Sequence, residues 1–586
     1  MFKLFKNLKP YVLFIIIGVS FVAAQGILEL QLPDMLKQII NEGLSLSEDG
    51  APVIDTAVVF RKSAIMLGFA VLASVCALIS SYFAAKVAAA FSKDVRRKLF
   101  SKVQTFSATE LDSFGTATLI NRSTNDITQV QQLVVMLMRV AIFAPVMLIG
   151  GTVMAFKTDI RMTAVLLISV PLIAIGAVVM LKVSFPVFKQ IQTRTDKLTA
   201  VMRENLTGVR VIRAFNREET EKERFDKANK DLTKSLIFAY RIMAVAIPLV
   251  MLLMNFTAIG VTFTVARGVT SAGWDPSAVG NMVAVSEYVF HIMFSILVVG
   301  MIASMIPRAV VSAGRIQQVL DSEVSIKDNP YAADCPAGGI VEFDNVGLRF
   351  AGADKFAVRN ISFTAKPGTV TAIIGSTGSG KSTIVNLLPR FYDVTEGSIK
   401  VDGVDVRDYN LMQLRAKLGF VPQKALLFTG TIADNLRFQK EDASDEEITA
   451  AAKMAEAYDF ITKKEDGFDS IVTQGGTNFS GGQKQRLAIA RAFVGKPEIY
   501  VFDDCFSALD FKTDAKVRQN ISQNLKGATV IIIAQRISTV MSADNIIVLD
   551  DGNIAMQGRH EELLKKCDVY REIALSQLSE EELGNV

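Results

Sequence analysis

The sequence predicts two halves of different fold class, an all-α membrane domain over residues 1–320 and an α/β domain over residues 340–586. Of the 586 residues, 50% are hydrophobic and the mean hydropathy is +0.33, which is high for a water-soluble protein of this length. Long uncharged runs are confined to the first half, whereas the second half has the composition of an ordinary mixed α/β protein. A chain of this length also needs more than one hydrophobic core.

Charge and cysteine content exclude several classes of protein. The formal net charge is only +4, so the chain lacks the basic character of a nucleic-acid-binding protein. Cys76, Cys335, Cys505 and Cys567 show no metal-ligand spacing, and the chain has only 2 histidines. We therefore expect neither a disulfide framework nor a zinc site, and no nucleic-acid partner.

Six stretches have the length of about 20 residues that a helix needs to cross a bilayer. The first is too long for the apolar region of a cleavable signal peptide, and no small-residue cleavage site follows it. The predicted transmembrane helices cover approximately residues 11–32, 63–85, 133–156, 162–185, 242–266 and 279–307.

The loops between these helices predict the topology. The loops at about 86–132 and 186–241 are long, rich in Lys and Arg, and helical in pattern, and the N-terminal tail carries Lys3, Lys6 and Lys9. Positively charged loops stay in the cytoplasm. We therefore expect both chain ends, both long loops and the α/β half to be cytoplasmic, in a multi-pass protein of the cell membrane.

Ionisable side chains within membrane helices are rare and often functional. Glu287 and His291 are one helical turn apart in the sixth predicted span, and their pattern fits either a cavity-lining patch or an anchor at the membrane interface. Glu29 lies near the end of the first span, and we expect its carboxylate to lie at the outer membrane interface, where a charged group is tolerated.

The second half begins after a charged segment with two prolines, the predicted linker at residues 321–339. An apolar strand, TAIIG, runs into GSTGSGKST and then into a helix. This strand–loop–helix order marks a P-loop, in which backbone N–H groups and the helix N-terminus bind phosphates. Lys381 would pair with the β- and γ-phosphates of ATP, and Ser382 would hold Mg²⁺. The predicted nucleotide-binding residues are Gly375, Ser376, Thr377, Gly378, Ser379, Gly380, Lys381, Ser382 and Thr383.

A second anion site is predicted at FSGGQ, where a turn with two glycines opens a basic amphipathic helix. One nucleotide does not need two γ-phosphate sites on one chain, so the second would cover ATP bound by another chain. The apolar strand IYVF then delivers Asp503, suited to Mg²⁺ through water, and Asp504 beside it. The residues predicted to face the partner's ATP are Ser480, Gly481, Gly482 and Gln483.

The order and spacing of these motifs resemble the ATP-binding-cassette (ABC) superfamily, and six spans before one cassette resemble an exporter half-transporter. The resemblance covers the whole chain, and SGGQ followed by KQRLAIARA is its most specific part. It implies a dimer with two ATP molecules sandwiched between the chains, and coupling helices near Glu110–Ala117 and Arg213–Glu223. It also implies that Phe350 stacks on adenine and that Gln423 is a further Mg²⁺ ligand.

Two residues depart from the family pattern at the γ-phosphate. Asp504 stands where active members carry Glu, and Gln535 stands where they carry His. A carboxylate shortened by one methylene is withdrawn by roughly 1 Å, and misplacement on that scale can slow a reaction about a hundredfold. Gln535 can donate a hydrogen bond but cannot become cationic as charge develops. A third departure, Gln474, replaces an acidic residue that many related exporters carry.

These departures predict the degenerate-site subunit of a heterodimeric bacterial multidrug exporter. The chain's own Walker A motif (GSTGSGKST) and Walker B motif (IYVFDD) would form a slow ATP site. Its signature motif (SGGQ) would complete an active site with a different half-transporter that keeps the catalytic Glu and His. The expected substrates are hydrophobic or amphipathic small molecules. Two alternatives are a homodimeric lipid or peptide exporter, and an ATP-gated regulatory subunit that transports nothing.

Overall fold

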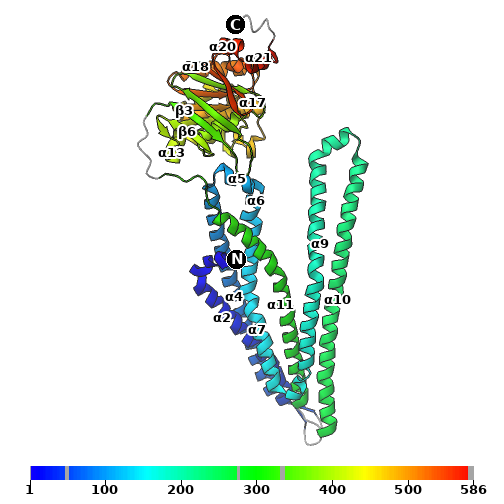
Figure 1. Ribbon diagram of the computed structural model, residues 1–586. Helices are drawn as coiled ribbons and strands as arrows, with labels where there is room; N and C mark the ends of the chain where they lie inside the picture. The colour runs from blue at the N-terminus through cyan, green and yellow to red at the C-terminus, as the bar shows by residue number, and fades with distance from the viewer. Residues whose placement is uncertain (1, 47–51, 273–276, 330–336, 579–586) are drawn as a thin grey trace. The chain divides into compact units, whose positions relative to one another are not determined.

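The computed structural model describes residues 2–46, 52–272, 277–329 and 337–578, and it divides into two compact units (Figure 1). The first unit, Met1–Gln104 with Thr116–Ser322, is helical apart from one short hairpin, and the second, Thr105–Gly115 with Glu323–Val586, contains the large sheets. The predicted order of an all-α half followed by an α/β half is confirmed. The short segment Thr105–Gly115 lies between two membrane helices in sequence, yet it packs as part of the second unit.

The membrane unit consists of helices much longer than a bilayer is thick. The 49 residues of α4 extend over roughly 70 Å at about 1.5 Å per residue, against a hydrocarbon core of about 30 Å. The helices therefore continue outside the membrane, as predicted. They are α1 (Phe2–Phe5), α2 (Val12–Glu29), α3 (Gln31–Gly43), α4 (Thr56–Gln104), α6 (Thr116–Asn121), α7 (Ile127–Thr158), α8 (Ile160–Thr163), α9 (Leu166–Ala214), α10 (Glu218–Ala272) and α11 (Ser277–Asp321), with the hairpin β1 (Leu44–Leu46) and β2 (Pro52–Ile54).

Five helical stretches among the described residues are long and apolar enough to span a membrane, where the sequence predicted six. Four of them contain the predicted spans 11–32, 63–85, 133–156 and 279–307, and the fifth, Pro248–Arg267, covers the predicted span 242–266 except for its first six residues. The remaining predicted span, 162–185, falls on α8 and α9, where the apolar helix of described residues is the shorter Ile160–Gly176. Several side chains between 177 and 189 lie outside the described residues, so the sixth span stays a prediction.

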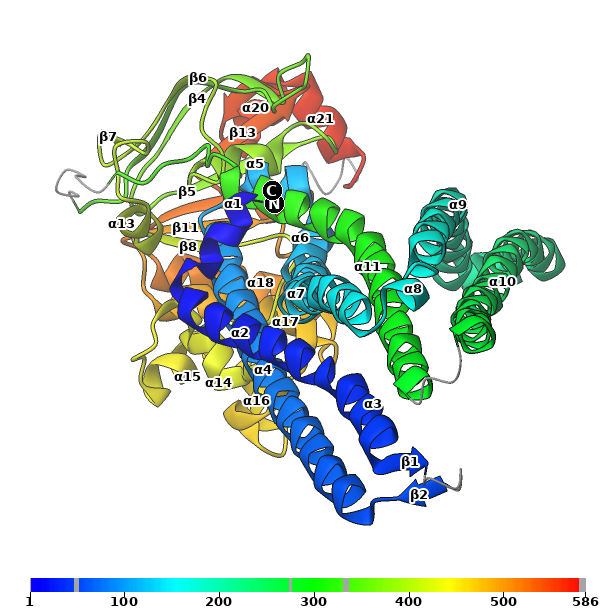
Figure 2. The ribbon, with the colours of Figure 1, turned by 90° about the horizontal axis from the view of Figure 1, so that it is seen from below.

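Within the membrane unit, α9 and α10 form an antiparallel pair distinct from the bundle of α2, α4, α7 and α11 (Figure 1). α2 and α3 lie along α4, and α7 packs against α11 (Figure 2). α9 and α10 are joined by a tight turn at Asn216, whose φ is +50°. The predicted coupling segment Arg213–Glu223 contains no helix of its own, because α9 ends at Ala214 and α10 starts at Glu218.

The three ionisable residues singled out in the membrane half lie in α2 and α11. The Glu29 carboxylate accepts a hydrogen bond of 2.8 Å from Gln25, one turn earlier in α2. On α11, Glu287 is exposed and His291 is half-buried, while Tyr288 between them is buried and donates to the carbonyl of Leu30. The exposed side of this turn of α11 therefore carries Glu287.

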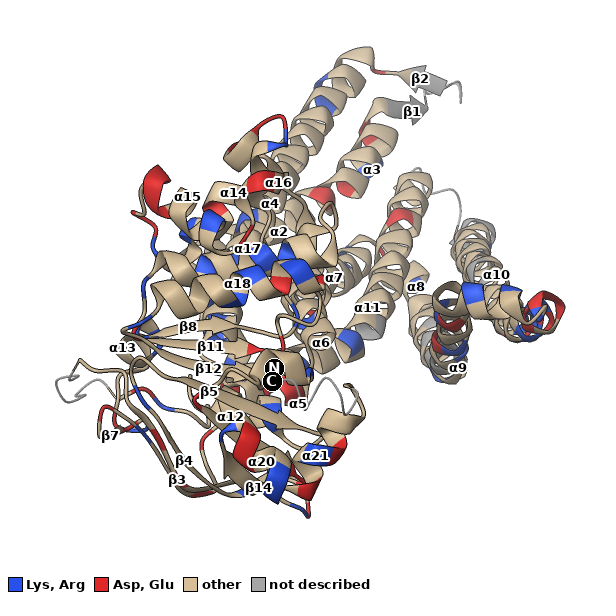
Figure 3. Cartoon of the chain, turned by 90° about the horizontal axis from the view of Figure 1, so that it is seen from above, with Lys and Arg blue, Asp and Glu red and all other residues tan. Residues whose placement is uncertain are grey.

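The second unit is built on a six-stranded sheet in the order β14-β13-β5-β12-β11-β8 and a four-stranded sheet in the order β4-β3-β6-β7. The pairs among β8, β11, β12, β5 and β13 are all parallel, and Figure 3 shows β8, β11, β12 and β5 side by side in this order. The strands are β3 (Val341–Leu348), β4 (Val358–Ala365), β5 (Val370–Gly375), β6 (Glu396–Val401), β7 (Val404–Asp405), β8 (Leu418–Val421), β9 (Gly430–Thr431), β10 (Ile471–Val472), β11 (Ile499–Asp503), β12 (Thr529–Ile533), β13 (Asn545–Asp550) and β14 (Asn553–Gly558).

Both faces of the parallel sheet are buried, which explains why its strands are continuous apolar runs in the sequence. On β5, Ala372 and Ile374 enter one hydrophobic core and Ile373 enters the other, as the two-residue period of a strand requires. The helices of this unit are α5 (Ala108–Phe114), α12 (Lys381–Leu387), α13 (Leu411–Ala416), α14 (Ile432–Leu436), α15 (Asp445–Met454), α16 (Tyr458–Thr462), α17 (Gly481–Val494), α18 (Phe511–Asn524), α19 (Ile537–Val540), α20 (His560–Lys566) and α21 (Asp568–Leu575).

Candidate nucleotide-binding site

The predicted catalytic residues come together at the carboxyl edge of the parallel sheet. The phosphate loop follows β5, Asp503 ends β11, and Gln535 lies two residues after β12, which is the strand between them. Ligands of open α/β sheets bind at this edge, because the carboxyl ends of neighbouring parallel strands meet there.

The phosphate loop has the open backbone that a bound anion requires. Gly378 and Gly380 have φ values of +88° and +94°, a conformation that other residues rarely adopt. A Cβ atom at Gly380 would lie 2.4 Å from the Val358 side chain. Ser376, Thr377 and Gly378 form an exposed rim, so their backbone is accessible to a ligand.

Two buried polar groups of this loop suit a phosphate. Lys381 is 8% exposed, and its ammonium donates to the carbonyls of Gly375 and Ser376 at 2.8 and 2.7 Å. Burial lowers the pKa of Lys381, although Asp503 and Asp504 act in the opposite direction. The Ser379 hydroxyl is buried and has no hydrogen-bond partner among the described residues. A phosphate in the loop would give both groups an anionic acceptor.

The two groups predicted for Mg²⁺ on the loop and on β11 are in contact. The Ser382 hydroxyl donates to Asp503 at 2.8 Å, and Asp503 is 5% exposed. Burial raises the pKa of Asp503, with Asp504 adding to this and Ser382 and Lys381 opposing it. Among the described residues, no group of three or more His, Cys, Asp or Glu side chains is arranged to hold a metal ion. Ser382 and Asp503 thus fit a cation that takes its other ligands from the nucleotide and water.

Asp504 and Gln535 are hydrogen-bonded to each other. Oδ2 of Asp504 accepts from Nε2 of Gln535 at 2.7 Å and from Nε2 of Gln423 at 3.1 Å. Asp504 is 7% exposed, and its φ of +46° places it in the left-handed region. Burial raises the pKa of Asp504 against the lowering effect of Gln423, Lys381 and Gln535. The short carboxylate is therefore held by two neutral amides.

Phe350 lies just beyond β3 and is 40% exposed, so it is accessible to a base. Its edge-to-face neighbour is Tyr392, at 5.3 Å between ring centroids. Sequence reasoning missed Tyr392, because no local pattern brings it to Phe350. It also missed Gln577, which donates to the backbone carbonyl of Gln535 at 2.8 Å from 42 residues further along the chain.

The signature motif forms the N-terminus of α17. Ser480 is the N-cap, its hydroxyl accepts from the backbone of Gln483, and the Gln483 side chain accepts from the backbone of Ser480. This reciprocal capping box fixes the start of the helix. Ser480 and Gly481 are exposed, whereas Phe479 before them is buried in the core. Among the described residues, Ser480–Gln483 make no hydrogen bond with the phosphate loop. Gln474 lies in an exposed turn just before the motif.

Comparisons with known proteins agree with this architecture. Residues 15–297 match the family of the ABC transporter transmembrane region, and residues 358–507 match the ABC transporter family. The chain is 39% identical, over 99% of both chains, to the ABC transporter ATP-binding protein MT1311 of Mycobacterium tuberculosis (strain CDC 1551). It is 31% identical to the ATP-dependent lipid A-core flippase of Haemophilus influenzae (strain 86-028NP), over 88% of this chain and 87% of the flippase. A solved structure of a bacterial Atm1-family ABC exporter with ATP bound shares the fold, with a TM-score of 0.77, 24% identity and 98% coverage of both chains.

Proposed function

Since the chain belongs to the ABC transporter family and joins a helical membrane domain to a cytoplasmic ATPase domain, we propose that it is one half of a heterodimeric exporter. Such a protein couples ATP hydrolysis to transport across the membrane. In this proposal the chain's own pocket holds ATP and hydrolyses it slowly. Its signature motif completes a fast site on a different half-transporter. The contact between Asp504 and Gln535 is the observation that carries the proposal.

The geometry of Asp504 supports slow hydrolysis at the chain's own site. A general base must lie within hydrogen-bond reach of the water that it activates. The Asp504 side chain is one methylene too short for the position of a glutamate, and its Oδ2 already accepts from both Gln423 and Gln535. Neither amide can supply the positive charge that a protonated histidine gives to a phosphate in its transition state. Phe350, Lys381 and Ser379 nevertheless remain suited to holding the nucleotide.

Several residues would hold Mg²⁺ and the phosphates together. Ser382 and Asp503 already meet, and Gln423 would join them by exchanging its hydrogen bond with Asp504 for the ion. Bound Mg²⁺ would neutralise phosphate charge. The polypeptide's part is to orient the phosphates through the loop backbone and Lys381, and to keep Asp503 ionised beside Ser382.

The signature helix supports the second half of the proposal. The exposed backbone at Ser480 and Gly481 begins a helix whose dipole favours an anion, and the capping box leaves the Ser480 hydroxyl at the surface. Ser480–Gln483 match the family pattern, whereas Asp504 and Gln535 in the chain's own pocket depart from it. An anion site that, among the described residues, makes no hydrogen bond with its own phosphate loop suits a nucleotide bound by another chain.

Exposed apolar residues at the end of the α9–α10 pair also favour a partner chain. Leu206 and Val211 are 75% and 61% exposed on α9, and Phe215 in the turn is 73% exposed. Charged residues are present towards the same ends of both helices (Figure 3). Large apolar side chains with this degree of exposure are typical of a surface that another protein covers.

We propose hydrophobic or amphipathic small molecules as substrates. A homodimeric lipid exporter is the second candidate, favoured by the 31% identity to a lipid A-core flippase. The two candidates differ in composition: a homodimer would carry Asp504 and Gln535 at both sites, so it would have no fast site at all.

Purification of the tagged chain from cells that express it at its native level tests the proposal. A second half-transporter should co-purify, the pair should hydrolyse ATP, and the chain alone should show almost no turnover. Replacing the catalytic glutamate of the partner should stop the pair, whereas Asp504→Asn should lower its turnover by less than about twofold. A homodimer that turns over at an ordinary rate of about 10 s⁻¹ would overturn the heterodimer.

Reconstitution in vesicles separates the transport candidates. Accumulation of a fluorescent amphipathic dye by the pair supports drug export, and movement of a labelled lipid between leaflets supports the lipid exporter. ATP hydrolysis by the pair with movement of neither the dye nor the lipid would favour the regulatory subunit.

A further inference from the structure

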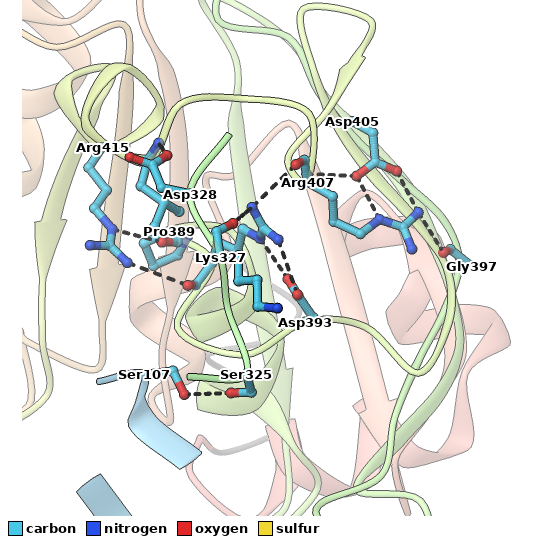
Figure 4. Close-up of polar contacts among 12 residues, drawn as sticks. Ser107, Ser325, Lys327, Asp328, Pro389, Asp393, Gly397, Asp405, Arg407 and Arg415 are labelled. Atoms are coloured by element: carbon cyan, nitrogen blue, oxygen red, sulfur yellow. Dashed lines mark hydrogen bonds and ion pairs between the residues drawn. The ribbon is translucent and has the colours of Figure 1, made fainter. Parts of the chain in front are cut away.

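The segment α5, which joins two membrane helices in sequence, is fixed to the second unit through a buried carboxylate. Glu110 is 7% exposed and accepts from the backbone of Ser107 at 2.8 Å and from the backbone of Ser325 at 3.2 Å. The hydroxyls of Ser107 and Ser325 lie 2.9 Å apart (Figure 4). Burial acts to raise the pKa of Glu110, but the hydrogen bonds from Ser107 and Ser325 outweigh it and lower the pKa. The carboxylate therefore stays ionised and ties α5 to the linker.

The described end of the linker, which we call the strap (residues 325–329), is held on its other side by the ATPase domain. Asp328 accepts from the backbone of Leu411 at 2.8 Å, and the carbonyl of Lys327 accepts from Arg390 at 3.4 Å (Figure 4). The strap thus lies between α5 and a short turn that follows the phosphate-loop helix. We call Pro389–Asp393 the clamp turn.

The backbone of the clamp turn closes α12 in a way that usually requires glycine. The N–H of Arg390 donates to Leu387 and the N–H of Phe391 donates to Asn386, which is the Schellman pattern at a helix end. The residue at the position of Arg390 is then left-handed, and its φ is +54°. An arginine at a position that favours glycine indicates that its side chain has a task.

The Arg390 side chain is almost fully buried and is bonded on three sides. Its guanidinium pairs with both oxygens of Asp393, at 2.7 and 3.2 Å, and also reaches the carbonyls of Lys327 and Arg407. Only a planar fork with five donors can make these bonds together, so lysine cannot replace it. Arg415 also holds this turn, by donating to the carbonyls of Pro389 and Arg390 (Figure 4).

Tyr392 gives the clamp turn a second grip, directly on α5. Its hydroxyl donates to Asp112 of α5 at 2.9 Å, while its ring contacts Phe350 edge-to-face. Burial, together with the bond to Asp112, raises the pKa of Tyr392 to about 12, so the hydroxyl keeps its proton at neutral pH. Phe350 and α5 therefore touch opposite ends of one side chain.

We propose that the clamp turn reports the nucleotide held at this chain's own site to α5, through Tyr392 to Asp112 and through Arg390 to the strap. Both ends of a bound nucleotide would be linked to the clamp turn. Phe350 would contact the base, and α12 runs from Lys381 at the phosphate loop to the clamp turn over only 7 residues, or about 10 Å. A slow site that keeps its ATP would hold α5 in place through many cycles of the other site. The inference rests on the proposed role of Phe350 at the adenine.

A test must separate nucleotide binding from its transmission. Spin labels at Phe60→Cys on α4 and Ile259→Cys on α10, both exposed positions, would report the ATP-dependent movement of the membrane helices in the purified transporter, with the native cysteines replaced by alanine. Fluorescent ATP would report binding. We expect Tyr392→Phe and Arg390→Lys to leave ATP affinity within about twofold, and to lower the fraction of transporters that switch by about threefold to tenfold.

Matched controls exist in the same domain. Arg407→Lys removes a guanidinium that pairs with Asp405 but does not reach the strap, and Tyr409→Phe removes a hydroxyl that donates to Val401. Both should leave switching unchanged. Arg390→Gly suits the left-handed backbone better than arginine, so loss of switching in a variant whose α12 is intact would exclude a purely structural role.

Two outcomes would overturn the proposal: unchanged switching in Tyr392→Phe and Arg390→Lys, or an equal loss in the two controls. Phe350→Ala separately tests the assumption that Phe350 binds adenine, because unchanged ATP affinity in that variant would contradict it. The test does not require a heterodimer, since a homodimer would carry the clamp turn in both chains.

Discussion

Two surfaces of the ATPase domain are suited to a nucleotide, and they differ in how complete they are. The N-terminus of α17 keeps its cap, its glycines and its exposed Ser480 hydroxyl. The pocket at the ends of β11 and β12 keeps the phosphate loop, but places Asp504 and Gln535 at the reacting end. Because the departures from the family pattern at Asp504 and Gln535 lie at only one of the two surfaces, general decay of the domain does not explain them. The two surfaces are separable, as they must be if they serve different nucleotides.

The largest effect is expected at the complete surface. Ser480→Arg should lower ATP turnover of the assembled transporter by about a hundredfold or more, because it removes a donor to the γ-phosphate and obstructs the site. Ser444→Arg is the matched control, since Ser444 caps α15 with the same capping box and lies at no predicted site. Comparable turnover in the two variants would show that Ser480 acts only as a helix cap.

A smaller effect is expected from the phosphate loop of the incomplete pocket. Lys381→Ala should weaken ATP binding to this chain's site by about tenfold or more, because a charged hydrogen bond is worth about 1.5–3 kcal/mol. Equilibrium binding of fluorescent ATP would measure it. Lys417→Ala disrupts a buried ion pair with Asp402 remote from the loop and should leave affinity intact while destabilising the domain. Full affinity in Lys381→Ala would contradict the assignment of the loop.

Restoring the reactive groups should abolish the difference between the surfaces. Asp504→Glu combined with Gln535→His should raise turnover of the pair by about twofold, because two sites would then fire instead of one. Each single change should do less, since both residues face one phosphate. Steady-state ATPase assays of the three variants decide this, and an unchanged rate in the double variant would place the defect elsewhere.

The smallest effect concerns stability. Burial raises the pKa of Asp504 in the folded state, so the ionised carboxylate destabilises the fold at neutral pH and this penalty disappears as pH falls through the normal aspartate range. Asp504→Asn should therefore raise the unfolding temperature of the nucleotide-free protein by about 2 °C at pH 7, and by less at pH 4. A scan of unfolding temperature at both pH values measures the difference. An equal shift at the two pH values would mean that charge burial is not its cause.

The motifs of the nucleotide site were predictable because each depends on residues close together in the sequence. A turn of glycines after a buried strand, or a serine cap before a helix, needs only local chemistry. The alternation of Ala372, Ile373 and Ile374 between two cores likewise follows from the strand period. The bonds that join Asp504 to Gln535 and Gln423 were not predicted, because they link three strand ends that only the sheet brings together.

The clamp turn lies beyond sequence reasoning for the same reason. Nothing in the sequence near Arg390 shows that its backbone is left-handed, and nothing near Tyr392 indicates Asp112, which precedes it by 280 residues. The docking of α5 was anticipated only through family resemblance, and the partners Ser325 and Tyr392 came from the structure.

The sequence by itself determined the two-domain organisation, the phosphate loop, the signature helix and the two departures at the γ-phosphate, because apolar runs and short motifs carry this information locally. Only the tertiary structure decided that the two departures bond to each other and that α5 is held by the clamp turn after α12. Those contacts join segments far apart in the chain. They form only when the sheet and the packing of α5 on the domain place them within hydrogen-bond distance.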